Sequence, residues 1–292
     1  MNELEIKLFK PMDESKRILL DSMGLENIYY YTLYVQPIVS LQYDSLIKKF
    51  EFLFRAFDKF DKVISPLEIF SEKRTHEDLK KLDLLVFENA MSLLSINKDS
   101  LCDAYMASIN VSEASIEDSS EYLDNIEQIR IDYGIEPKNI CLELTEKAYD
   151  GIGEFTNKSL LLKYFLAVDD FGSKHSATGL VLHGLLNSIP EGMADHIIVK
   201  LDMFYVKNLD NSTVIYSDII RGVYHTFLGF KKYKGLKLVA EGARDLESTM
   251  GLKSNRVDFV QSFFTGEPME FNENYKQPIY SKKVPQLSFD FE

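Results

Sequence analysis

The chain has 292 residues, of which 45% are hydrophobic, and a formal net charge of −13. This composition is that of a globular protein and excludes a disordered one, and the length suits one large α/β barrel or two ordinary domains. The acidic surface argues against polymeric nucleic acid as a partner, although bound metal can let an acidic protein hold a phosphate ligand. No uncharged apolar run reaches the ~20 residues of a membrane span, so we expect no membrane partner.

The N-terminal segment and the cysteines point to the cytoplasm. Glu3, Glu5 and Lys7 interrupt any apolar stretch at the start, so no secretory signal is visible. Cys102 and Cys141 match no zinc spacing and no disulfide framework. We therefore expect reduced thiols and a cytoplasmic protein.

The chain divides into three predicted parts, a helical extension over 1–27, a barrel domain over 28–274 and a tail over 275–292. The segment Ser15 to Leu25 has the pattern of a short helix. Two strands follow, over Tyr29 to Leu41 and Lys49 to Phe57, and Pro66 to Asn97 has helical spacing. Pro37 lacks a backbone donor, which predicts that the first strand lies at a sheet edge or ends there.

A repeated pattern then runs through the chain, in which a short apolar, strand-like run ends in a polar or charged residue. The residues at these ends are Asn110, Glu143, Asp169 with Asp170, Lys200, Glu241 and Gln261. Helix-length segments precede most of the later runs, which predicts a parallel sheet. In a closed barrel the carboxyl ends of the strands open on one face, and that face holds the active site.

Asp169 and Asp170 are adjacent, and side chains alternate between the faces of a strand. The two carboxylates can share a site only where the strand ends and the chain turns, and Gly172 supplies freedom for that turn. Taken alone, the pair could equally cap a following helix. Together with the other strand ends, it favours a cation between the carboxylates.

The donor set predicts a site for hard cations, Mg²⁺ or Mn²⁺, because all its ligands are oxygen atoms. Its five carboxylates are enough to hold two such ions. Its members are Glu51, Asn110, Glu143, Asp169, Asp170 and Glu241. Such a site activates water for an in-line phosphoryl displacement. Lys200 could orient or deprotonate that water or neutralise charge in the transition state, or it could form a plain salt bridge to Asp202 or a neighbouring carboxylate.

The sequence resembles the EAL domain family, which contains the phosphodiesterases of cyclic di-GMP. The resemblance covers roughly Tyr30 to Glu270 and rests on eight segments found in the family's order. They are QPIVSL (36–41), EFLFR (51–55), INVS (109–112), ICLELTE (140–146), DDFG (169–172), VKLD (199–202), VAEG (239–242) and DFVQSFF (258–264). The family fold is a TIM-like (β/α)8 barrel with one antiparallel strand.

The resemblance implies a role for each matched residue. Glu51, Asn110, Glu143, Asp169, Asp170 and Glu241 match its metal ligands. Lys200 matches the lysine at the attacking water, and Gln36, Arg55 and Gln261 match positions at the dinucleotide or beside the water, with Arg55 at a phosphate. Glu146 matches the glutamate that anchors the loop after DDFG.

Four departures from the family pattern bear on the strength of the implied activity. Phe52 stands where alanine is usual, Ser173 to Ala177 replaces the loop Thr-Gly-Tyr-Ser-Ser, Arg244 replaces a glutamate, and Ser262 replaces a glycine. The resemblance implies hydrolysis of cyclic di-GMP to linear pGpG, and we expect the altered loop to lower its rate. The alternative is a weak or inactive protein that acts as a cyclic di-GMP receptor or binds a protein partner, and the family also admits a homodimer. A different metal phosphohydrolase stays open as a third reading.

Overall fold

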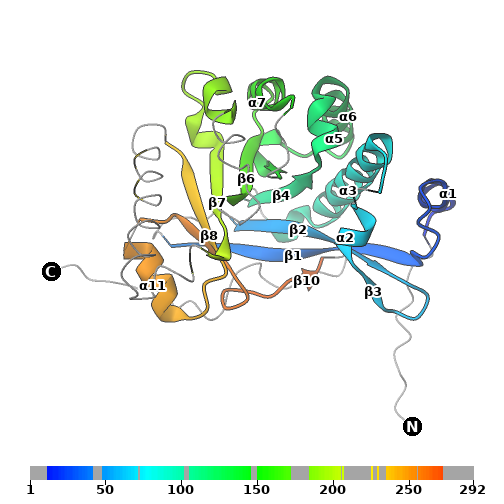
Figure 1. The fold of residues 1–292 in the computed structure, drawn as a ribbon, viewed down its shortest axis with the longest axis horizontal. Helices are drawn as coiled ribbons and strands as arrows, with labels where there is room; N and C mark the ends of the chain where they lie inside the picture. Colours follow the sequence, from blue (N-terminus) through cyan, green and yellow to red (C-terminus); the bar gives the residue numbers. More distant parts are fainter. Residues whose placement is uncertain are drawn as a thin grey trace, which may run out of the picture.

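A computed structural model describes residues 12–41, 48–71, 73–101, 105–145, 150–171, 184–204, 206, 225, 229, 235–254 and 256–271. The chain folds as a mixed α/β protein around a closed barrel of eight strands (Figure 1). The barrel strands are β1 (Tyr30–Ser40), β2 (Lys48–Phe57), β4 (Tyr105–Val111), β5 (Ile140–Leu144), β6 (Phe165–Phe171), β7 (Ile197–Leu201), β8 (Lys237–Glu241) and β9 (Phe259–Gln261). The short strands β3 (Val63–Ile64) and β10 (Met269–Glu270) extend the sheet beside β2 and β1.

One barrel strand runs against the others. The pairs from β2 through β4, β5, β6, β7 and β8 to β9 are all parallel, whereas β1 is antiparallel to both β2 and β9. The expected TIM-like barrel with one antiparallel strand is thus confirmed. We call the end of the barrel where the parallel strands finish the barrel mouth.

The prediction that Pro37 lies at an edge or ends its strand is wrong. The strand β1 continues to Ser40 and has partners on both sides. On the side away from β2, Tyr34 and Val35 pair with β10, and Val39 and Ser40 pair with β9. Pro37 lies between these two stretches, where no strand of the described residues pairs with β1 on that side, so its missing N–H breaks no ladder among them.

Helices cover the outside of the barrel. They are α1 (Glu14–Ser22), α2 (Pro66–Ile69), α3 (His76–Ile96), α4 (Lys98–Leu101), α5 (Glu113–Glu117), α6 (Ser119–Asp132), α7 (Ile152–Leu161) and α11 (Leu246–Ser254), with short 3₁₀ turns at Pro137–Asn139 and Ala194–His196. In Figure 1, α3, α5, α6 and α7 follow one another over one side, and α11 lies on another. No helix in the described ranges is long and apolar enough to cross a membrane.

The predicted helix over Pro66 to Asn97 is two helices. A turn after α2 ends the first, and α3 begins at Thr75, whose side chain accepts from the backbone N–H of Asp78 while the Asp78 carboxylate accepts from Thr75. This capping box satisfies donors at the start of the helix and fixes where it begins. The buried face of α3 then packs on the outer side of β4 and against α5 and α6 in the main hydrophobic core.

A separate apolar layer fills the barrel interior below the mouth. Its residues are Ile38, Met106, Cys141, Ala167, Ile198, Val239 and Phe259. Side chains two residues apart on a strand point to the same face. The residues two positions further along β5, β6, β7, β8 and β9 therefore also point inward, at the level of the mouth. This alternation places the polar residues of the strand ends directly above the apolar layer.

Candidate metal and phosphate site

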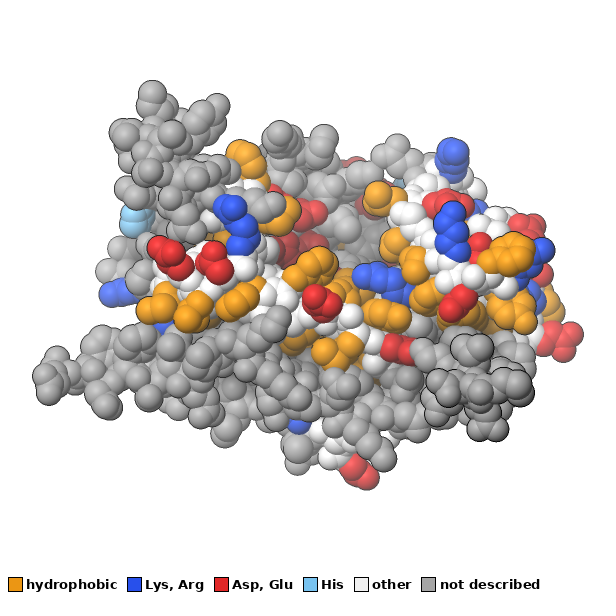
Figure 2. Space-filling model, turned by 90° about the horizontal axis from the view of Figure 1, so that it is seen from below, with side chains coloured by type: hydrophobic (Ala, Val, Ile, Leu, Met, Phe, Trp, Pro, Cys, Tyr) orange, Lys and Arg blue, Asp and Glu red, His pale blue; other side chains and the backbone are white. Residues whose placement is uncertain are grey.

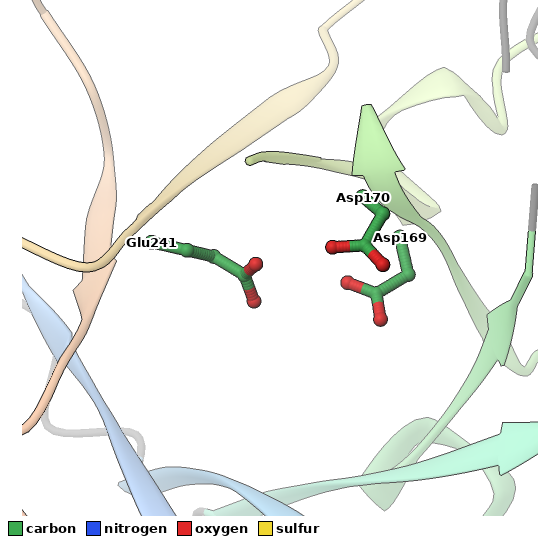
Figure 3. Close-up of side chains that lie close together, drawn as sticks. All are labelled: Asp169, Asp170 and Glu241. Carbon is green, nitrogen blue, oxygen red and sulfur yellow. The ribbon is translucent and has the colours of Figure 1, made fainter. Parts of the chain in front are cut away.

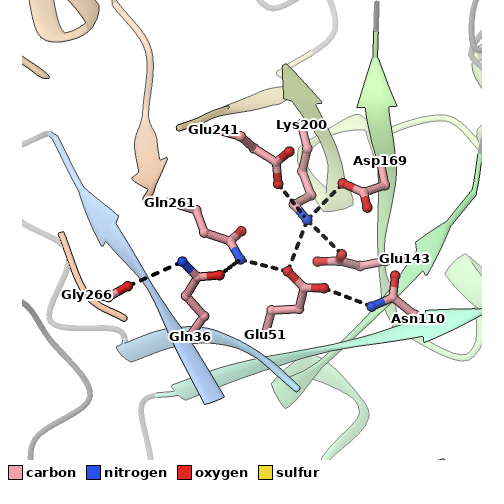
Figure 4. A network of polar contacts seen from close by, with 9 residues as sticks. All are labelled: Gln36, Glu51, Asn110, Glu143, Asp169, Lys200, Glu241, Gln261 and Gly266. Atoms are coloured by element: carbon pink, nitrogen blue, oxygen red, sulfur yellow. Dashed lines mark hydrogen bonds and ion pairs between the residues drawn. The ribbon is translucent and has the colours of Figure 1, made fainter. Parts of the chain in front are cut away.

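Lys200 lies at the centre of the barrel mouth, with carboxylates on every side (Figure 4). Its Nζ atom lies 3.2 Å from Glu51 Oε2, 2.9 Å from Glu143 Oε2, 2.8 Å from Asp169 Oδ1 and 3.0 Å from Glu241 Oε1. We call Glu51, Glu143, Asp169, Asp170 and Glu241 the carboxylate cluster. One ammonium group cannot neutralise five carboxylates, so the cluster carries excess negative charge whenever its members are ionised.

The two aspartates share the site because the end of β6 is irregular. The pairing of β6 with β7 shifts register between Val168 and Phe171, and Asp170 has a φ of +50°. A left-handed residue breaks the alternation of side chains, so Asp169 and Asp170 both face Glu241 across the mouth (Figure 3). One oxygen from each of Asp169, Asp170 and Glu241 lies within 4.8 Å of the others. The turn thus occurs at Asp170 itself, and Gly172 lies outside the described residues.

Burial and charge push the pKa values of the cluster apart. Burial raises the pKa of Glu143 well above its usual value, and the charges of Glu51 and Asp169 add to the effect. Burial also raises the pKa of Glu241, to about 8. For Glu51, burial opposes ionisation, but Lys200 and the amides of Gln261 and Asn110 hold its pKa below the usual value. The site therefore retains protons that a bound cation would displace.

The amide residues expected at the site bind to the cluster. Asn110 Nδ2 donates to Glu51 Oε1 over 2.8 Å, and Gln261 Nε2 donates to Glu51 Oε2 over 2.7 Å. Gln261 Nε2 also lies 3.3 Å from Gln36 Oε1, which joins Gln36 to the same network. The antiparallel pairing makes this possible, because it sets Gln36 directly opposite Glu51 in the register of β1 and β2.

Arg55 lies apart from these contacts, at a cavity beside the cluster. Its Nη1 atom donates to the carbonyl of Phe54 over 2.9 Å, and its guanidinium lies 5.8 Å from the centre of the Tyr34 ring. The cavity has a volume of about 410 Å³ and is lined by Arg55, Asn110, Ser112, Thr145 and apolar side chains from β2, α2 and α3. Figure 2 shows acidic side chains at a recess in this face of the molecule, with hydrophobic and basic side chains beside them.

Two residues of this region were missed in the sequence. Asp83 on α3 is 3% exposed, and its Oδ2 accepts from the backbone N–H of Ser112 and from the hydroxyls of Ser112 and Ser115. It thereby fixes the end of β4 just beyond Asn110. Thr145 lies two residues after Glu143, and its Oγ1 is buried without a hydrogen-bond partner among the described residues. The alternation along β5 could have indicated Thr145, whereas nothing in the pattern of α3 indicated Asp83.

Of the four departures from the family pattern, two lie away from the cluster. Phe52 packs on the outer side of β2 against Phe50 and Phe271, and it lines the cavity that also contains Arg55. Arg244 is exposed before α11. Ser262 lies in the turn after β9, next to Gln261. Glu146 and the loop Ser173 to Ala177 lie outside the described residues, as does the tail over 275–292.

Fold and site together define a β/α barrel protein with an acidic cluster, a central lysine and a polar-rimmed cavity at its mouth. The sequence model of the EAL domain family matches residues 30–268, and the chain belongs to this family.

Three known proteins illustrate the similarity. The cyclic di-GMP phosphodiesterase PdeB of Shewanella oneidensis is 27% identical over 243 residues, covering 81% of this chain and 26% of that protein. The chain thus spans about a quarter of the length of this curated relative. The EAL domain of FimX from Pseudomonas aeruginosa, bound to cyclic di-GMP, superposes with a TM-score of 0.68 at 16% identity, covering 90% of this chain and 99% of that one. The manganese and cyclic di-GMP complex of BlrP1 from Klebsiella pneumoniae superposes with a TM-score of 0.63 at 20% identity, covering 82% of this chain and 56% of that one. At these identities the likeness to solved structures shows the fold alone.

Proposed function

We propose that the chain is a metal-dependent phosphodiesterase that hydrolyses cyclic di-GMP to linear pGpG. The observation that carries the proposal is the buried lysine held by carboxylates at the mouth of an EAL barrel. The named activity of PdeB and the bound cyclic di-GMP in FimX and BlrP1 support the choice of substrate.

The residues of the mouth fit a pair of hard cations. The three oxygens of Asp169, Asp170 and Glu241 are close enough to share one ion, and Glu143 Oε1 is buried without a hydrogen-bond partner among the described residues. An all-oxygen donor set suits Mg²⁺ or Mn²⁺. The residues that would hold two ions are Glu51, Asn110, Glu143, Asp169, Asp170 and Glu241. Bound there, the ions would supply Lewis-acid activation of a water and of the phosphoryl oxygens.

The chain's own residues account for the remaining work. Lys200 can hold the attacking water and offset negative charge that develops on the phosphoryl group, because its ammonium is fixed by Glu143 and Asp169. Arg55, at the cavity rim, can bind a phosphate of the dinucleotide. Gln36 and Gln261 would bind the nucleotide or orient the water. The floor of apolar side chains excludes bulk water from below.

Two measurements test this proposal on the full chain. Incubation with cyclic di-GMP and Mg²⁺ or Mn²⁺, followed by chromatography, should show its conversion to pGpG, and no other phosphodiester in a substrate panel should be hydrolysed faster. Calorimetry in Ca²⁺ measures binding of the nucleotide separately. Binding without turnover in Mg²⁺ or Mn²⁺ would replace the enzyme by a cyclic di-GMP receptor. Absence of both would overturn the assignment of the nucleotide itself.

A further inference from the structure

The turn after β9 is held by two buried hydroxyl side chains. Ser262 and Thr265 are 4% and 0% exposed. The backbone N–H of Ser262 donates to Thr265 Oγ1 over 3.1 Å, and the backbone N–H of Thr265 donates to Ser262 Oγ over 3.2 Å. Thr265 Oγ1 also donates to the carbonyl of Ser262 over 3.0 Å. These reciprocal bonds fix the path of the chain between Gln261 and Gly266, which we call the 262–266 turn.

The far end of the turn is fixed against β1. The backbone N–H of Gly266 donates to the carbonyl of Ser262 over 2.9 Å. A Cβ atom added at Gly266 would lie 2.2 Å from Pro37 Cγ, so only glycine lets the turn approach the strand this closely. The carbonyl of Gly266 then lies 3.3 Å from Gln36 Nε2, the residue before Pro37.

This contact determines how the two glutamine amides are oriented (Figure 4). A carbonyl only accepts, so Gly266 fixes the NH₂ group of Gln36 toward the turn and its Oε1 toward Gln261. That oxygen in turn faces Gln261 Nε2, which donates to Glu51. The opposite atom, Gln261 Oε1, is left buried and without a hydrogen-bond partner among the described residues. It can accept from a donor on a bound water or on the nucleotide.

The structure assigns Ser262 and Thr265 as positioning residues, which hold Gly266 so that Gln36 and Gln261 present fixed amide orientations to the ligand. The inference deepens the proposed function and rests on it, because the ligand it serves is cyclic di-GMP. A serine at the position where the family uses glycine thereby gains a role in this chain. It replaces backbone freedom with a side-chain bond to Thr265.

The test compares Thr265→Val with Thr249→Val. Both changes remove a buried hydroxyl that donates to a backbone carbonyl, but Thr249 lies on α11 and bonds to Asp245. Thr265→Val removes both bonds between Thr265 Oγ1 and the backbone of Ser262. We expect the worth of one hydrogen bond, about 1 kcal/mol or roughly fivefold in binding, to be lost at the ligand. We expect Thr265→Val to raise the Kd for cyclic di-GMP in Ca²⁺ and the KM in Mg²⁺ about fivefold, with kcat within twofold. Thr249→Val should change none of these, and Thr265→Ser should restore wild-type binding.

A second comparison tests whether the effect passes through Gln36. In the Gln36→Ala background, Thr265→Val should weaken binding no further, because the glutamine that Thr265 positions has already been removed. Additive losses in this cycle, or an equal loss from Thr249→Val, would overturn the inference. Hydrogen exchange at the Gly266 amide and the side-chain amide shifts of Gln36 provide a readout that needs no nucleotide. If the wild type fails to bind cyclic di-GMP, the proposed function fails. Unchanged exchange and shifts in Thr265→Val would then show separately that the turn does not position Gln36.

Discussion

The ammonium group of Lys200 lies 2.9 Å from Glu143 Oε2, and the two side chains are only 2% and 1% exposed. Burial alone would lower the pKa of Lys200, but Asp169, Glu143, Glu241 and Glu51 raise it well above its usual value. Lys200 is therefore charged at neutral pH, and the carboxylates hold it in one place.

Replacing this lysine should affect stability and catalysis separately. Lys200→Met leaves the buried carboxylates without their counter-charge, and breaking a buried ion pair costs about 3–5 kcal/mol. In metal-free protein, we expect a loss of that order in the free energy of unfolding, measured by urea denaturation. In Mg²⁺, kcat should fall roughly 10²–10⁴-fold while binding of cyclic di-GMP in Ca²⁺ persists. Lost binding with unchanged turnover at saturation would contradict the role.

A second buried lysine provides the control. Lys49 is 9% exposed in the barrel interior, where its Nζ lies 3.5 Å from Met106 Sδ and 4.9 Å from the centre of the Phe259 ring. No carboxylate of the described residues forms an ion pair with it. Lys49→Met makes the same chemical change without orphaning a charge, so neither the unfolding free energy nor kcat should fall as in Lys200→Met.

Asp169→Asn should abolish metal-dependent hydrolysis while the fold persists. The change removes one ligand charge from the group formed with Asp170 and Glu241. We expect the Kd for Mn²⁺, measured by calorimetry, to rise at least tenfold, with a circular dichroism spectrum like that of the wild type. Asp258→Asn is the control, because Asp258 is buried and accepts from the backbone N–H of Leu238, away from the cluster. Wild-type turnover of Asp169→Asn at saturating Mg²⁺ would refute the metal assignment.

The fall of stability with rising pH should flatten when metal binds. The pKa of Glu241 is about 8 in the folded protein and near 4.5 when unfolded, so between these values the folded state binds more protons. Stability of metal-free protein must then fall as pH rises from 6 to 8, by up to about 1.4 kcal/mol per pH unit for one proton. The burial of Glu143 acts in the same direction. A bound cation displaces these protons, so metal affinity should rise with pH. Thermal melts with and without Mn²⁺ measure both trends, and Glu241→Gln should flatten the metal-free slope.

Gly242→Ala should weaken metal binding, whereas Gly134→Ala should not. Both glycines have positive φ, +71° and +64°, so each alanine costs about 1 kcal/mol or more in backbone strain. At Gly134 an added Cβ meets nothing within 4 Å, but at Gly242 it would lie 2.4 Å from Met203 Cγ. Either the exposed Met203 or the chain at Gly242 must therefore move, and we expect the chain to move in part and to displace Glu241. This is supported if both variants lose a similar amount of melting temperature but only Gly242→Ala has a raised Kd for Mn²⁺. An equal Kd for the two variants would count against it.

The sequence predicts the barrel strands and their polar ends well because each depends on local chemistry. An apolar run such as Ile197 to Val199 can only be buried, and the charged residue that follows, Lys200, then lies at a strand end. The expected site residues Glu51, Asn110, Glu143, Asp169 and Lys200 indeed come together at the mouth.

The features that could not be predicted from the sequence depend on contacts between distant segments. The error at Pro37 arose because the gap between β9 and β10 is set by residues more than two hundred positions away. Asp83 looks like any polar residue on a helix until α3 packs against Ser112. The bulge at Asp170 is equally hidden, since aspartate adopts a left-handed conformation only when its surroundings impose it.

The closure of the barrel also has a consequence for how the chain folds. The strand β1 pairs with β2 early in the sequence, but its other neighbour is β9, through Val39 with Val260. During synthesis the growing sheet therefore keeps an unpaired edge until almost the whole domain has left the ribosome. Contacts of such large sequence separation make folding slow. Because Gln261 is on the closing strand, the binding site is completed in the same late step that removes the exposed edge.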